Sequence, residues 1–122
     1  MAVETYKRGS VVLVRFPYTD LTGSKVRPAV IVTPEKYLAN SEDVLCAFIS
    51  SVLPDPLLQT DIVISSIHSD FRRAGLKRSS VLRTHKLVLL NKELVYSKLG
   101  DLSAMLTKQM NAGLIEALGL NE

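Results

Sequence analysis

Short apolar segments, each followed by turn-forming residues, fill most of the chain before Gly100. Runs of about four to eight Val, Ile and Leu residues bounded by Gly, Pro or Asp are typical of β-strands. The strands predicted by this pattern span residues 10–16, 27–33, 44–50, 60–64 and 80–90, the second beginning at Arg27 or Pro28 and the last bending near His85. Segments 17–25, 53–56 and 69–78 contain Pro or Gly and are predicted to be loops, and 34–40 forms at most a short helix or turn.

The tail after Gly100 has a different pattern. Its large apolar residues recur at steps of four and are Leu102, Leu106, Met110, Leu114 and Leu118. This spacing predicts a helix with one slowly turning apolar stripe, capped by Asp101 or Ser103 and ended by Gly119. Gly113 weakens such a helix by roughly 1 kcal/mol. Strands first and one helix last indicate a small β-barrel or curled sheet that the helix closes.

The length of 122 residues fits a single domain, which we expect to span residues 1–122. All apolar runs are far shorter than the roughly 18 residues of a membrane helix, and the charged N-terminus has no apolar signal segment, so we expect no membrane association. Cys46 is the only cysteine and stands in an apolar run. We therefore predict a buried thiol in a protein of the reducing cytoplasm.

Basic residues are concentrated between residues 71 and 92. The seven in this stretch are Arg72, Arg73, Lys77, Arg78, Arg83, Lys86 and Lys92, and the stretch contains no acid. Elsewhere eight Lys and Arg stand against twelve Asp and Glu, so a basic region lies on a mildly acidic body. This distribution is typical of a protein with a polyanionic partner, but a solvated basic loop has the same composition. Charge alone leaves both interpretations open.

The common enzyme signatures are missing. The chain has neither a phosphate-binding loop with its Lys and Ser or Thr nor a Gly-x-Ser-x-Gly elbow. No cluster of His, Cys, Asp and Glu has the spacing of metal ligands. We therefore expect no metal and no cofactor, and any chemistry must use Arg, Ser, Thr, His and backbone groups.

Several sequence blocks resemble the MazF/PemK family of toxin endoribonucleases. That family opens with a Gly-led apolar strand, a loop containing Phe-x-x-Thr and a strand that starts with Arg-Pro-Ala. The matching blocks are residues 8–20, 23–32, 47–51, 80–83 and 98–103, with Arg27-Pro28-Ala29 at the strand start. Many members carry a Glu-Gln pair and a Gly shortly before this arginine, whereas residues 22–26 read Thr-Gly-Ser-Lys-Val here.

The resemblance implies an SH3-like β-barrel with a C-terminal helix. It also implies a homodimer that cleaves single-stranded RNA without a metal, as the toxin of a toxin–antitoxin system. In many family members a cognate antitoxin peptide covers the RNA groove, so we expect such a peptide as a partner here.

Metal-free RNA cleavage needs a base for the 2′-hydroxyl, an acid for the leaving 5′-oxygen and positive charge for the phosphorane. Arg27 is the first candidate for the charge, because a guanidinium binds phosphate through two parallel hydrogen bonds. Ser50 matches the position of a catalytic Ser or Thr in the family, and Ser51 competes for that role. The alternatives are a surface arginine before a proline and a strand-end hydroxyl that bonds its own backbone.

Arg83 and His85 stand two residues apart, so on a strand their side chains share one face. In the plasmid-borne branch of the family, an arginine followed two positions later by an acid forms part of the active site. His85 takes the place of that acid and could transfer protons near neutral pH, or it could simply face solvent. His68 is interpreted as a loop residue, with a second acid or base role as the alternative.

Further residues are predicted to contact RNA. Tyr18 could offer a face for base stacking, whereas the neighbouring Phe16 is expected in the core. The remaining RNA-binding candidates are Thr19, Lys25, Ser51, Arg72, Arg73, Lys77 and Arg78.

Two other classes of function remain open. The same barrel could bind RNA or a protein without catalysis, as gyrase-inhibiting toxins of this architecture bind a protein, and fold alone does not decide between these functions. A weaker alternative is a structural partner that only dimerises. Arg27, Ser50 and the basic stretch favour RNA.

Overall fold

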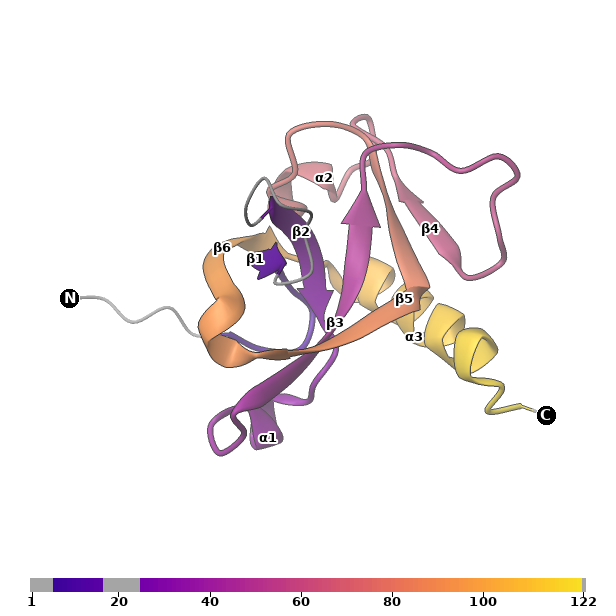
Figure 1. Cartoon of the computed structure of the whole chain (residues 1–122). Coiled ribbons are helices and arrows are strands. Elements are labelled where there is room, and N and C mark those ends of the chain that lie inside the picture. Colours follow the sequence, from indigo (N-terminus) through magenta and orange to yellow (C-terminus); the bar gives the residue numbers. More distant parts are fainter. Residues whose placement is uncertain (1–5, 17–24, 122) are drawn as a thin grey trace.

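The computed structural model describes residues 6–16 and 25–121. Its elements are β1 (Ser10–Phe16), β2 (Lys25–Ile31), α1 (Glu35–Leu38), β3 (Asp43–Ser50), β4 (Asp61–Ile64), α2 (Phe71–Ala74), β5 (Ser80–Asn91), the 3₁₀ turn η1 (Lys92–Leu94), β6 (Val95–Asp101) and α3 (Ala104–Leu118). The strands form one antiparallel sheet in the order β4-β5-β3-β2-β1-β6. The sheet curls, and α3 covers one of its faces (Figure 1). The predicted fold class, mainly β with a C-terminal helix, is confirmed.

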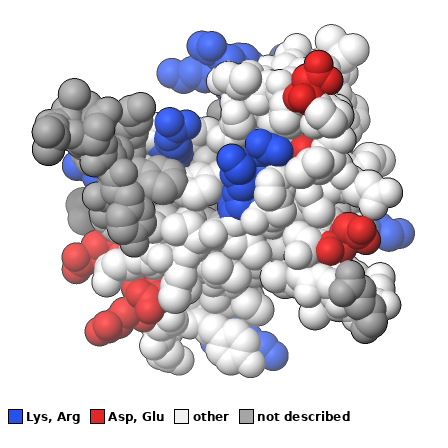
Figure 2. Space-filling model, turned by 45° about the vertical axis from the view of Figure 1, so that its right-hand side comes forward, with Lys and Arg blue, Asp and Glu red and all other residues white. Residues whose placement is uncertain are grey.

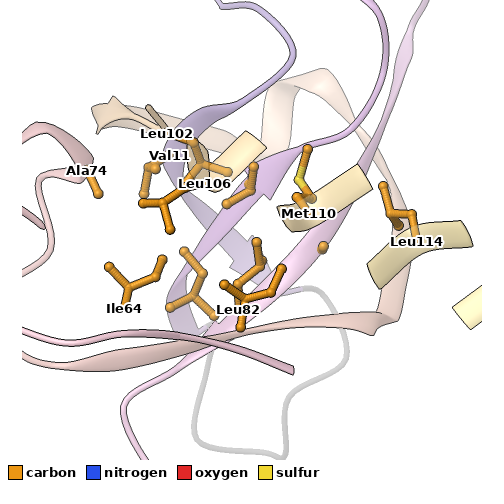
Figure 3. Packing of buried hydrophobic residues seen from close by; sticks show 12 residues of the cluster. Val11, Ile64, Ala74, Leu82, Leu102, Leu106, Met110 and Leu114 are labelled. Atoms are coloured by element: carbon orange, nitrogen blue, oxygen red, sulfur yellow. The ribbon is translucent and has the colours of Figure 1, made fainter. Parts of the chain in front are cut away.

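The main core lies between α3 and the sheet (Figure 3). Four members of the predicted helix stripe are buried there: Leu102, Leu106, Met110 and Leu114. Leu118, the last of the stripe, is 55% exposed. Each step of four residues turns the side chain by about 40° around a helix of 3.6 residues per turn, so the stripe has rotated away from the sheet at this point.

The ends of α3 follow the sequence signals. Of the two cap candidates it is Ser103 that caps the helix, because its hydroxyl accepts a hydrogen bond from the N–H of Leu106 at 3.2 Å. Gly119 ends the helix in the left-handed conformation. None of the helices in the described part of the chain is long and apolar enough to cross a membrane.

A second apolar cluster lies on the other side of the sheet and includes Val12, Val14, Ile31 and Cys46. The Cys46 side chain is fully buried, as predicted, and burial raises the pKa of its thiol to about 12. The thiol therefore stays protonated and unreactive.

Three local features extend or correct the sequence interpretation. Part of the predicted loop 69–78 forms α2, a helix of only four residues that ends at Gly75 in the left-handed conformation. Residues 95–101, for which the sequence pattern predicts no element, form the edge strand β6 beside β1. The expected bend near His85 is present, since the β3–β5 register shifts between the pairs Ala47–Leu87 and Phe48–Arg83.

Candidate active-site groove

The sheet opens between β2 and β3. Their pairing ends at Ala29 and Phe48, and beyond this pair β2 continues along β1 alone while the end of β3 continues along β5 alone. Pro28, which carries no N–H, stands where the pairing stops. Two residues further along each strand, the same register places Arg27 opposite Ser50. The strands have separated there, so the space between them is a groove rather than a hydrogen-bonded ladder.

The groove has a volume of about 570 Å³. Its lining consists of Leu13, Val26, Arg27, Pro28, Ile49, Ser50, Ser51, Val52, Gly75, Leu76, Lys77, Arg78, Ser80 and Leu99. These residues include three cations and three serines but no Asp, Glu or His. Figure 2 shows several Lys and Arg side chains close together on the upper part of one face of the molecule. The groove thus offers positive charge and hydroxyl groups on an apolar floor.

The loop after α2 forms one wall of the groove and is held by two glycines. A Cβ atom on Gly75 would overlap the carbonyl of Leu99, and one on Gly100 would overlap the carbonyl of Arg73. The backbones of α2 and β6 therefore touch at a point where no side chain fits. This contact fixes the start of the segment that carries Lys77 and Arg78 into the groove.

The Ser50 hydroxyl bonds its own local backbone. It accepts a hydrogen bond from the N–H of Val52 at 3.1 Å and donates to the Val52 carbonyl at 3.2 Å. A hydroxyl that bonds its own backbone was the alternative predicted for Ser50 from the sequence. Ser50 makes this bond and also lines the groove. Ser51, its competitor, is exposed and lines the same groove.

Arg83 does not line the groove but pairs with a buried carboxylate. Its Nε donates to Asp61 Oδ1 at 3.0 Å, and the Asp61 side chain is fully buried. Burial acts to raise the pKa of Asp61, but the hydrogen bonds from the Leu58 N–H and from Arg83, with the charges of Arg83 and His85, outweigh it and lower the pKa below its ordinary value. The guanidinium charge of Arg83 is therefore compensated within the protein.

His85 belongs to the same cluster. Its Nδ1 lies 3.2 Å from the Thr60 hydroxyl and 3.9 Å from Asp61 Oδ1. Arg83 and His85 were predicted from the sequence but Asp61 was not, because an Asp at the start of a short strand has the same signal as a turn former. Only the pairing of β4 with β5 reveals it, since Asp61 is the register partner of Arg83.

The register also relates this cluster to the groove. Paired residues of neighbouring strands share a face of the sheet, and Arg83 pairs with Phe48, which lies two residues before Ser50. Ser50 and Arg83 therefore lie on the same face in adjacent rows, roughly 7 Å apart along the strands. Arg27, opposite Ser50 in the extended register, belongs to this face as well.

The other predicted RNA contacts fall in several places. Lys77 and Arg78 line the groove, Arg72 lines a neighbouring hollow, and Arg73 is exposed on α2 but lines neither. Lys25 begins β2, while Tyr18 and Thr19 lie outside the described residues.

The basic stretch 71–92 is not one continuous surface. Arg83 is paired with Asp61, and Lys92 donates from Nζ to the Leu38 carbonyl at 2.6 Å, near α1. Of the seven basic residues, four lie on α2 and the loop that follows it, namely Arg72, Arg73, Lys77 and Arg78, and Lys86 is exposed on β5. Within residues 6–16 and 25–121, no group of three or more His, Cys, Asp or Glu could hold a metal ion.

Comparison with protein families gives one match over most of the chain. A sequence model of the PemK-like, MazF-like toxins of type II toxin–antitoxin systems matches residues 7–118. No curated protein sequence is significantly similar to the chain.

Solved structures with the same fold include several toxins of low sequence identity. One is an endoribonuclease from a mycobacterial species in complex with its cognate antitoxin, with a TM-score of 0.75, 18% identity and coverage of 93% of this chain and 95% of that one. The Mycobacterium tuberculosis toxin MazF-mt6 gives a TM-score of 0.72 and 17% identity, covering 90% and 96% of the two chains. A MazE–MazF structure from Deinococcus radiodurans (Form-II) gives a TM-score of 0.77 and 15% identity, covering 97% of this chain and 99% of that one. At such identities these likenesses establish the fold.

Proposed function

Because the chain belongs to the PemK-like, MazF-like toxins of type II toxin–antitoxin systems, we propose that it is an endoribonuclease that cleaves single-stranded RNA without a metal. The observation that carries this proposal is the groove between β2 and β3, whose described lining residues include three cations and three serines but no carboxylate. Such a lining attracts a polyanion and repels no part of it. It favours RNA over the protein target of a gyrase-inhibiting toxin.

In this proposal the 2′-oxygen of one nucleotide attacks the adjacent phosphorus, and the bond from phosphorus to the 5′-oxygen breaks. The products are a 2′,3′-cyclic phosphate and a free 5′-hydroxyl. Arg27 stabilises the extra negative charge of the phosphorane, because its exposed guanidinium has no ion-pair partner among the described residues. Arg83 is less suited to this task while Asp61 neutralises it.

The hydroxyl and proton-transfer roles go to groups on the same face of the sheet. Ser50 or Ser51 donates a hydrogen bond to a phosphate oxygen in the groove. For Ser50 this requires exchanging its bond to the Val52 carbonyl for one to the phosphate. His85 is the candidate acid or base, with its Nδ1 beside the Thr60 hydroxyl.

We also propose two partners. Some of the solved structures with this fold contain an antitoxin, and a cognate antitoxin peptide that occupies the groove would exclude RNA from it. A homodimer is the second assembly implied by the family. The segment after β3 carries exposed apolar side chains at Val52, Leu53, Leu57 and Leu58, and these would be covered in a dimer.

The direct test is incubation of the pure protein with a long single-stranded RNA in the presence of EDTA. Discrete fragments ending in a 2′,3′-cyclic phosphate are the expected result. RNA that binds but stays intact would support a binding module instead, and an RNA that neither binds nor breaks would contradict both. Light scattering at micromolar concentration tests the dimer.

A further inference from the structure

A second hollow lies next to the groove. It has a volume of about 720 Å³ and is lined by Ser66, His68, Ser69, Phe71, Arg72, Gly75 and Leu76. Gly75 and Leu76 also line the groove, so the two cavities share one wall. The close contact of Gly75 with Leu99 fixes this wall. An RNA strand that leaves the groove across Leu76 would therefore reach the hollow next.

The tautomer of His68, one of the lining residues, is set by a hydrogen bond from the main chain. The N–H of Asp70 donates to His68 Nδ1 at 3.0 Å. A neutral imidazole carries hydrogen on only one ring nitrogen, so an accepting Nδ1 assigns the hydrogen to Nε2. In this neutral form, His68 has an N–H to donate from Nε2.

Arg72 adds a positive charge to the same hollow. It is exposed on α2, and no ion pair or hydrogen bond of its guanidinium occurs among the described residues. The nearest acid in sequence, Asp70, does not line the hollow and accepts a hydrogen bond of 2.6 Å from the Ser103 hydroxyl. Among the residues that the structure describes, the lining therefore combines a guanidinium, an imidazole N–H and two serines with no carboxylate, which is a donor set suited to an anion.

The loop that carries the histidine is tied to the groove side of the molecule. The N–H of Ser66 donates to the Ser79 hydroxyl at 2.7 Å, and Ser79 stands between Arg78 and Ser80, both of which line the groove. The Ser103 hydroxyl, which caps α3, also holds Asp70 at the start of α2. Contacts of this kind keep both cavities in a constant position relative to each other.

We propose that this hollow is a subsite for a phosphate group of the RNA strand, one or more nucleotides beyond those held in the groove. Arg72 supplies the charge and His68 donates from Nε2 to a phosphate oxygen. This inference rests on the proposed function, because a phosphate would be presented to the hollow by an RNA strand that already lies in the groove.

The test uses mixed-sequence 2′-O-methyl oligoribonucleotides of increasing length, which bind but cannot be cleaved because they lack a free 2′-hydroxyl. Fluorescence anisotropy with the whole chain should show a step in affinity once the oligonucleotide is long enough to reach the hollow. Arg72→Ala should weaken binding of the long oligonucleotides about tenfold and reduce the slope of log K against log salt by about 1. It should leave the short ones almost unaffected.

Two comparison variants distinguish binding at this subsite from a general electrostatic attraction between the protein and RNA. Arg73→Ala removes the same charge from the neighbouring position on α2, which does not line the hollow, and should cost about twofold or less. His68→Ala should weaken binding of the long oligonucleotides and leave the short ones almost unaffected, because it removes the Nε2 donor from the hollow.

Equal losses of affinity for Arg72→Ala and Arg73→Ala would overturn the proposed subsite. So would a wild-type affinity that does not rise with the length of the oligonucleotide. Cleavage of a long RNA by the wild-type protein is measured beside these titrations. A protein that cleaves RNA but shows no difference between the two arginine variants keeps the proposed function and loses only the subsite.

Discussion

Arg27 lies opposite Ser50 in the extended register of β2 and β3, at the point where the two strands have stopped pairing. Both residues line the groove. Each side chain is thus mounted on a strand that is paired on its other side, Arg27 to Val14 of β1 and Ser50 to Val81 of β5. A site built this way has rigid walls, although its centre carries no ladder hydrogen bonds.

The first prediction concerns Arg27. If its guanidinium stabilises the phosphorane, Arg27→Ala should slow single-turnover RNA cleavage on the order of 10²–10³-fold. RNA affinity should fall far less, because Lys77 and Arg78 remain in the groove. Arg27→Lys should restore little of the rate, since an ammonium cannot form two parallel hydrogen bonds with a phosphate.

The matched control for Arg27 is Lys108→Ala, which removes one exposed charge on α3, outside the groove. It should cleave at the wild-type rate. An Arg27→Ala protein that cleaves as fast as this control would remove Arg27 from the mechanism. The thermal unfolding temperature of both variants should match that of wild type, because Arg27 and Lys108 are both exposed.

The second prediction concerns His85. If His85 is the acid or base, His85→Gln should lower kcat about 10²–10⁴-fold and remove one limb of the pH–rate profile. Thr60→Val keeps the imidazole but removes the hydroxyl beside Nδ1, so it should cause a smaller loss of rate. If His85→Gln keeps both its rate and the two limbs of the profile, His85 takes no part in proton transfer.

The sequence predicted elements well where one local signal dominated. The apolar runs gave β1, β3, β4 and β5, and the leucine spacing with Ser103 and Gly119 gave α3. No local signal predicted β6. This strand pairs with β1, a segment more than eighty residues earlier in the sequence. Edge strands with mixed exposure have little apolar periodicity, so their assignment depends on long-range pairing that a local pattern does not contain.

The candidate site divides in the same way. Arg27 and Ser50 were predicted from strand-end positions and family motifs, and the groove unites them. Arg83 was predicted as an active-site residue from its spacing to His85, and the pairing of β4 with β5 sets its guanidinium against Asp61. A partner from another strand determines whether a charge is available, and a pattern within one segment cannot identify that partner.

The third prediction concerns Gly113, where two effects oppose each other. Helix propensity alone favours Gly113→Ala by roughly 1 kcal/mol. A Cβ there would lie 2.7 Å from Thr84 Oγ1 and 3.0 Å from its Cγ2. Thr84 is buried and its hydroxyl donates to the Thr60 carbonyl at 2.7 Å, so it cannot move aside cheaply. Overpacking costs about 1–3 kcal/mol, so we expect a net loss in the free energy of unfolding.

Chemical denaturation of two further variants checks this reasoning. Adding Thr84→Ala removes both clashing atoms, so the Gly113→Ala change should become neutral or stabilising in that background. Ala112→Gly, at the exposed neighbouring position, should show only the propensity cost of about 1 kcal/mol. A more stable single Gly113→Ala variant would contradict the close approach of α3 to β5.

The last prediction concerns Asp61 and the response to acid. Its folded-state pKa lies below the ordinary value of about 3.9, so near that pH the unfolded chain binds more protons than the folded one. The stability from the ionised carboxylate is therefore complete above pH of about 5 and is lost as the pH falls through the folded pKa. At neutral pH, Asp61→Asn should lower the free energy of unfolding by about 2 kcal/mol, because the charged hydrogen bonds with Arg83 disappear. Urea unfolding from pH 7 downward should show wild type and variant converging in acid, whereas Asp43→Asn, at an exposed position, should follow wild type throughout. A difference that stays constant down to the lowest pH would mean that Asp61 contributes through packing and that its ion pair with Arg83 adds no stability.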